Sequence, residues 1–206
     1  MNKNKTGRFA LVVLLIVLAV SIGQNAKNVA EKDRIGRYMI NHAYAALTNI
    51  SFNLEGLIYN IENKITDDDT NRQSLTMISH YFVRLDTVLK QYATYFPPKG
   101  GVRNGYTGIF DFDFISYTLT GGTGTANGTS YKGILVDDAI SENEIHYLEA
   151  LRDDINLIIA DMVSPDNPPQ ENQNLTVSQL DNILNTFFDK WSFHNAESPY
   201  FLLREE

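Results

Sequence analysis

The feature that most constrains this chain is a nearly continuous apolar run over residues 9–22, from Phe9 to Ile22. The basic residues Lys3, Lys5 and Arg8 precede the run, and no acidic residue occurs before residue 31. Basic residues stay on the cytoplasmic side of a membrane while an apolar segment enters it, so the rest of the chain is expected to cross. We therefore predict a cytoplasmic flank and membrane anchor in residues 1–24 and an extracytoplasmic helical domain in residues 25–206.

The alternative to an anchor is a signal peptide that is removed. The run is shorter than the roughly 20 apolar residues that span a bilayer comfortably. Ser21 and Gly23 are small enough to precede a cleavage site at Gln24, although they match such a site less well than two alanines. Helix-forming residues resume directly after this point, which favours a single-pass anchor in the cell membrane over secretion after cleavage near Gly23.

Charge and cysteine content exclude several kinds of function. The chain has a net charge of −8, and without the three positive charges ahead of the apolar run the remainder carries −11. Such an acidic body repels phosphate groups, so we expect no nucleic-acid partner. The chain has no cysteine, which excludes disulfides, thiolate metal sites and cysteine nucleophiles.

The segment after the apolar run has a helical period. Eleven-residue spacing corresponds to 3.67 residues per turn and keeps apolar side chains on one face of a nearly straight helix. A helix over about residues 28–65 is therefore predicted, and its length requires that other helices cover the apolar face. Three interleaved rows carry this period: Ile35, Ala46 and Leu57; Met39, Ile50 and Ile61; Ala43, Leu54 and Ile65.

Three more helices follow from capping boxes and apolar stripes. In a capping box, a hydroxyl and a carboxylate or amide three residues later satisfy backbone N–H groups at the helix start. The pairs with this spacing are Thr70 with Gln73, Ser141 with Glu144, and Thr176 with Gln179. The second helix carries a heptad seam of Leu75, Ile78, Phe82, Leu85, Leu89, Tyr92 and Phe96. The fold class predicted is mainly α: an antiparallel four-helix bundle preceded by the membrane segment.

Residues 99–139, between the second and third predicted helices, have a different pattern. Phe110, Phe112 and Phe114 alternate with polar residues at a spacing of two, which is typical of a strand. Residues 130–136 are a candidate return strand, and Asn127 with Gly128 is a favoured hairpin turn. We predict a β-hairpin insertion lying over one end or side of the bundle, and a tail (residues 194–206) that folds back on the bundle or pairs with the hairpin.

Aromatic side chains in this insertion are the candidate binding residues, because recognition surfaces are often loops on a rigid scaffold and are rich in aromatics. The alternative is that they close the open end of the helical core. The candidates are Tyr106, Phe110, Phe112, Phe114, Tyr117 and Tyr131.

Candidate catalytic and metal residues are sparse, and we expect no metal, no cofactor and no catalysis. His42, His80, His146 and His194 fall about one per helix but lack the Glu-x-x-His spacing of helical metal sites. Asp111 and Asp113 are the one carboxylate pair expected to share a strand face, which a solvated strand also explains. The run at residues 67–69 is interpreted as charge that favours a helix N-terminus.

The function predicted is that of a binding or assembly component of the cell envelope, held in the membrane by residues 9–22, with another envelope protein as its partner. One alternative is a small-molecule-sensing ectodomain that acts through a partner and holds its ligand near His42, Tyr81 or Tyr92. The other is a hydrolase or cation-dependent enzyme that uses Asp111 and Asp113.

Overall fold

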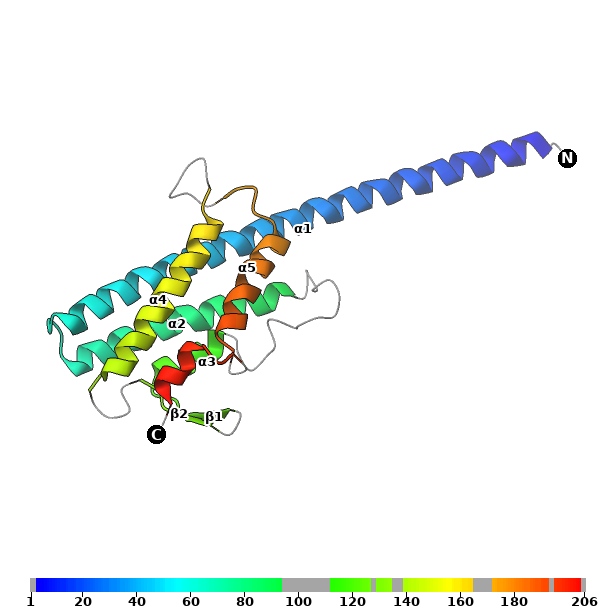
Figure 1. Ribbon diagram of the computed structural model, residues 1–206. Helices are drawn as coiled ribbons and strands as arrows, with labels where there is room; N and C mark the ends of the chain where they lie inside the picture. Colours follow the sequence, from blue (N-terminus) through cyan, green and yellow to red (C-terminus); the bar gives the residue numbers. More distant parts are fainter. Residues whose placement is uncertain are drawn as a thin grey trace.

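A computed structural model of the chain is mainly helical, with a small antiparallel hairpin and a long apolar N-terminal helix (Figure 1). It describes residues 3–93, 112–126, 129–134, 139–164, 172–192 and 195–204, without the side chains of residues 3–12, 92–93 and 126. The elements are α1 (Lys3–Glu62), α2 (Asp68–Ala93), α3 (Phe112–Leu119), β1 (Gly124–Ala126), β2 (Thr129–Tyr131), α4 (Glu142–Met162), α5 (Val177–Lys190) and the 3-10 helix η1 (Pro199–Leu203). The predicted mainly helical class is confirmed.

The apolar run and the periodic segment form one helix. α1 has 60 residues, which corresponds to a length of about 90 Å. Its first part extends away from the other elements (Figure 1), and the large apolar side chains from Val13 to Ile22 are 44–66% exposed. This part is long and apolar enough to cross a membrane. The second part lies in the core, where Ala43, Leu47 and Ile50 are fully buried.

The other helices cover the apolar face of α1. α2 runs back along α1 in the opposite direction, α4 packs against α1, and α5 packs against α4 and α1 (Figure 1). The predicted seam of α2 faces inward, with exposures of at most 1% for Leu75, Ile78, Phe82, Leu85 and Leu89. The side chains of Tyr92 and Phe96 lie outside the described part of the chain.

Two of the three predicted capping boxes are present. The Ser141 and Thr176 hydroxyls accept hydrogen bonds from the third helical residue, whose side chain accepts from the cap backbone in return. The box predicted at Thr70 is wrong, because α2 begins at Asp68 and the backbone N–H of Thr70 donates to Asp67 Oδ1 at 2.8 Å. A carboxylate just before the first turn accepts from the free N–H groups and also favours the positive end of the helix dipole, which explains the earlier start.

The strand predicted from Phe110 onward is wrong over residues 112–119, which form α3. Phe112, Ile115 and Leu119 are spaced by three and four residues, so a helix places all three on one face, where each is at most 1% exposed. This helical spacing competes with the two-residue alternation of the aromatics, and packing of the face against α2 decides the outcome. Tyr106, Phe110 and Asp111 lie outside the described residues.

A hairpin is present, but it is shorter than predicted and its first strand is β1, not the strand predicted from Phe110. β1 pairs with β2 from Gly124 opposite Tyr131 to Ala126 opposite Thr129, so the strands flank residues 127–128, which lie outside the described part. The return strand, predicted over residues 130–136, ends at Tyr131 because the next N–H, that of Lys132, donates to the Leu203 carbonyl at 2.8 Å. Tyr131 also forms a bridge with Arg204. The tail therefore pairs with the hairpin, as predicted.

Candidate binding sites

Those predicted aromatic binding residues that the structure describes do not share one surface. Phe112 and Tyr131 are buried, with exposures of 0% and 2%. Phe114 is partly buried, and its ring centroid lies 5.1 Å from that of Tyr200. Tyr117 is 50% exposed, and its hydroxyl donates to the Thr123 carbonyl at 3.0 Å. Among the described members, Tyr117 therefore offers the largest surface, and the binding role of the set remains a prediction.

Phe112 joins three helices in the core. Its ring centroid lies 5.6 Å from Phe82 of α2, 5.6 Å from Phe187 of α5 and 5.0 Å from Phe188 of α5. Stacked and tilted ring pairs at these distances stabilise beyond the area they bury. α3 therefore acts as a wedge that connects α2 with α5.

The core also contains a polar contact between α4 and α3. The Tyr147 side chain is fully buried in α4, and its hydroxyl lies 3.0 Å from the Thr118 Oγ1 of α3. Burial disfavours the phenolate and raises the pKa of Tyr147 well above its ordinary value. The phenol therefore stays protonated, and its hydrogen bond with Thr118 connects α4 with α3.

Asp154 of α4 is a buried carboxylate that connects to α5. Its Oδ1 accepts from Lys190 Nζ at 2.6 Å, and its Oδ2 accepts from Trp191 Nε1 at 2.8 Å. The carboxylate is 5% exposed, whereas the lysine side chain is 50% exposed. This contact was not predicted, although Asp154 follows Leu151 by three residues and therefore lies on the apolar face of its helix.

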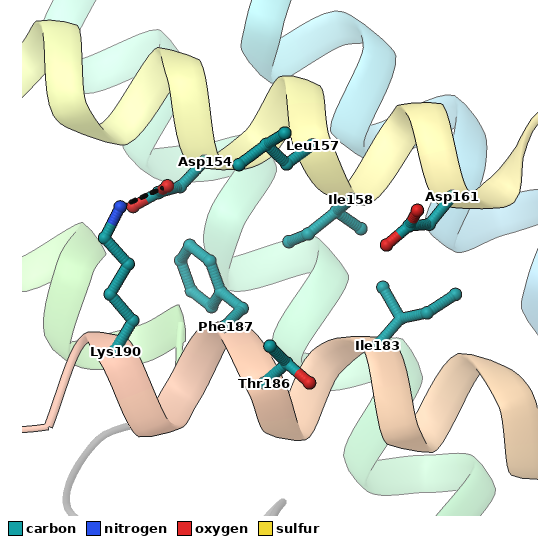
Figure 2. Close-up of a pocket in the computed structure, with 8 residues that line it drawn as sticks. All are labelled: Asp154, Leu157, Ile158, Asp161, Ile183, Thr186, Phe187 and Lys190. Atoms are coloured by element: carbon teal, nitrogen blue, oxygen red, sulfur yellow. Dashed lines mark hydrogen bonds and ion pairs between the residues drawn. The ribbon is translucent and has the colours of Figure 1, made fainter.

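An open groove runs between α4 and α5 beside this contact, with a volume of about 130 Å³. Figure 2 shows the Asp154–Lys190 pair at one end, Asp161 and Ile183 at the other, and apolar side chains between them. Leu157 on its rim is 64% exposed. The groove is lined by Asp154, Leu157, Ile158, Asp161, Ile183, Thr186, Phe187 and Lys190.

The volume of the groove limits what it can hold. Pockets for drug-sized molecules measure roughly 300–1,000 Å³, whereas an apolar cavity of about 150 Å³ holds a benzene-sized group. The groove therefore fits one inserted side chain of a partner better than a whole metabolite.

A larger and more polar hollow lies where the start of α5 meets α1. Its volume is about 620 Å³, and its lining includes Lys32, Asp33 and Arg37 of α1 together with residues 173–178. The Arg37 guanidinium donates to the carbonyls of Asn172 at 3.2 Å, Leu175 at 3.4 Å and Gln173. These bonds hold the segment before α5 onto α1, so one wall of the hollow is fixed to the other.

The three histidines that the structure describes lie on three different helices, α1, α2 and α4. His42 is partly buried with its ring centroid 4.0 Å from that of Tyr38, and His80 is exposed. A hydrogen bond to Glu149, 2.9 Å from His146 Nδ1, raises the pKa of His146. In the part of the chain that the structure describes, no group of three or more His, Asp or Glu residues is placed to hold a metal ion. His194 lies outside that part.

The predicted carboxylate pair is not found on a strand. Asp113 lies in the first turn of α3, and its carboxylate is 3.0 Å from Lys90 Nζ. Lys90 Nζ also lies 2.6 Å from the buried carboxylate of Asp86. The strand expected to carry both Asp111 and Asp113 is thus replaced at Asp113 by a helix, and the described contacts of Asp113 are those of an ion-pair network.

Comparison with known proteins gives no assignment: no protein-family model matches the chain, and no curated protein or solved structure matches it.

Proposed function

We propose that this chain is a membrane-anchored, extracytoplasmic helical protein that binds another envelope protein as part of an assembly, and that it has no catalytic activity. The single observation that carries the proposal is the continuity of α1. One helix leaves exposed apolar side chains over residues 13–22 and then buries Met39, Ala43 and Leu47 in the core. A helix of this kind holds a folded body close to a membrane without a flexible linker.

The proposed orientation follows from charge. The basic flank stays in the cytoplasm, α1 crosses the membrane once, and the acidic remainder lies outside. In this proposal α1, α2, α4 and α5 form an antiparallel four-helix bundle with α3 wedged between α2 and α5. Release after cleavage near Gly23 is the alternative.

The proposed partner contact is the groove between α4 and α5. Its size suits a single side chain, its floor is apolar, and Asp161 at its rim is exposed. A partner that inserts an apolar side chain and places a basic group near Asp161 would be complementary to it. Partner anchors of this kind are often aromatic or arginine side chains.

The test is recovery of cross-linked material from intact membranes. Deletion of residues 99–139 is unsuitable, because it removes the core residues Phe112, Ile115, Leu119, Tyr131 and Ile134. We compare Leu157→Glu in the groove with Met77→Glu, which is 42% exposed on α2. The proposal predicts loss of a specific cross-linked partner only in Leu157→Glu, and equal recovery from both variants and the wild type would contradict it.

A second function, small-molecule sensing through a partner, is favoured by the hollow at the start of α5. Its volume of about 620 Å³ is within the range of small-molecule pockets, and its lining combines basic, acidic and amide groups. Ligand binding there would raise the unfolding temperature of the full chain. A ligand whose shift disappears in Lys32→Ala and persists in Leu157→Glu supports this function, and a broad screen without any shift contradicts it.

A further inference from the structure

The face of α1 opposite the core carries a row of exposed residues at seven-residue intervals. Tyr38, Phe52 and Tyr59 are 55%, 75% and 59% exposed, and Ala45, also exposed, occupies the remaining position. These four residues are called the outer row. The inward rows of the same helix recur every eleven residues, so the two faces of α1 have different periods.

Seven-residue spacing is the period of helices that pair with a left-handed supercoil. Between members of the outer row lie the exposed residues Asn41, Thr48, Asn49, Glu55 and Gly56, of which only Glu55 is charged. A methyl group built at Gly56 meets nothing within 4 Å, which leaves space for a neighbouring helix to approach the backbone. The outer row therefore has the spacing, apolar character and small neighbours of a helix-pairing surface.

We propose that the outer row pairs with the outer row of a second copy of this chain. A twofold axis parallel to α1 would set each member against its own equivalent, so the surface is complementary to itself. This inference rests on the anchoring part of the proposed function, because anchored copies share one orientation and meet in parallel. Confinement to a membrane also raises the effective concentration of each copy for the other.

The available area is consistent with a dimer that depends on the membrane. Aromatic side chains bury roughly 150–250 Å² each, so three that are more than half exposed would contribute about 300–400 Å² per copy. A standard interface buries about 800 Å² per partner. The remainder is available from the residues between the ring positions and from the exposed apolar surface at residues 13–22 of the same helix.

Disulfide cross-linking of the full chain in membranes tests the pairing, and the absence of native cysteine makes single-cysteine variants straightforward. A disulfide forms only when the two Cα atoms approach within about 7 Å. We expect Ala45→Cys, Phe52→Cys and Tyr59→Cys to give disulfide-linked dimers at least fivefold more than the control variants Thr76→Cys and Met77→Cys, exposed on α2. Equal cross-linking at all five positions, or none at the outer row, would overturn the inference.

A charge substitution provides an independent readout. Phe52→Glu places a carboxylate near its equivalent and near the exposed Glu55 of both copies, so cross-linking through Ala45→Cys should fall at least tenfold. Met77→Glu in the same background should leave it unchanged. A chain that remains in the membrane as a monomer overturns the pairing alone, whereas a dimer recovered from the soluble pool overturns the anchoring alone. A cross-link to a protein of different mass also overturns the second-copy assignment.

Discussion

At the scale of single residues, stability depends on a few buried polar contacts. Asp154 accepts hydrogen bonds from Lys190 and Trp191 and so fixes α5 to α4. The serine hydroxyls of Ser79 and Ser116 meet in the core at 2.6 Å and connect α2 to α3. Contacts of this kind specify which helices meet, because a misplaced partner would leave a buried polar group without a hydrogen bond.

Substitution of Asp154 tests its role. In Asp154→Ala the buried Trp191 Nε1 loses its acceptor, and we expect the free energy of unfolding to fall by about 2–3 kcal/mol. The exposed lysine adds little to this figure because solvent screens its charge. Asp153→Ala is the matched control, since the Asp153 side chain is 63% exposed, and it should change stability by less than about 0.5 kcal/mol. The free energy of unfolding of both variants is measured with denaturant in detergent. Equal losses in the two variants would contradict the role of Asp154 in fixing α5 to α4.

Asp67 gives a prediction for pH. Hydrogen bonds from the side chain and backbone of Thr70 lower the pKa of Asp67 below its ordinary value of 3.8. The stability that the Asp67 carboxylate adds to the folded protein is therefore fully present above pH 3.8 and is lost as the pH falls through the lower folded-state pKa. The unfolding temperature of Asp67→Ala should lie below that of the wild type at pH 7, with a difference that shrinks toward pH 2. Asp69→Ala, in the same turn, is the control and should lower the unfolding temperature at pH 7 by less than Asp67→Ala. Equal unfolding temperatures for the two variants would argue against Asp67 as the helix cap.

At the scale of elements, the turn after α3 organises the hairpin. Gly121 has a positive φ of 82°, and the N–H groups of Gly121 and Gly122 donate to the Thr118 and Tyr117 carbonyls at 3.3 and 2.9 Å. This is a Schellman motif, which satisfies the last carbonyls of a helix and favours glycine at the left-handed position. Gly133 packs against this turn so closely that an added methyl group would lie 2.6 Å from the Gly122 backbone nitrogen and oxygen.

Gly133→Ala tests this close approach. The methyl group must displace backbone atoms, so we expect a loss of about 1–3 kcal/mol in unfolding free energy. Gly124→Ala provides the control, because a methyl group there meets nothing within 4 Å. The unfolding temperature of Gly133→Ala should lie clearly below that of Gly124→Ala. Equal unfolding temperatures would show that Gly133 does not pack against the turn as described.

Helices could be predicted from the sequence wherever packing and local signals agree. The boxes at Ser141 and Thr176 and the seam of α2 from Leu75 to Leu89 appear as predicted. The eleven-residue rows hold along α1 but fail at Ile65, which lies beyond the end of α1 at Glu62 and is 59% exposed. The prediction failed where two periods coexist, as in residues 112–119, because only packing against α2 selects the helix. The α4–α5 groove could not be predicted, since it depends on how far apart two helices lie. The position of Asp154 on an apolar helix face could be recognised in the sequence. Its partners could not, because they lie 36 and 37 residues further along the chain.

At the scale of the whole molecule, α1 determines the extended shape, and the proposed membrane location depends on the same helix. A single helix carries the exposed apolar segment, the inward rows that the other helices cover, and the outer row (Figure 1). Loss of helical continuity near Gly23 would separate these parts. A proline within a helix destabilises it by about 3 kcal/mol or more. We therefore expect Gly23→Pro to leave the unfolding temperature of the helical body unchanged and to reduce dimer cross-linking. Unchanged cross-linking in this variant would show that pairing does not need a continuous helix.

The most direct test of the anchoring role of α1 is the intact mass of the protein recovered from membrane and soluble fractions. We expect the full chain, including residues 1–24, to remain in the membrane fraction after an alkaline wash. An intact chain recovered in the soluble cytosolic fraction, or a mature form beginning at Gln24 in the soluble exported fraction, would contradict an α1 that joins membrane and core in one helix.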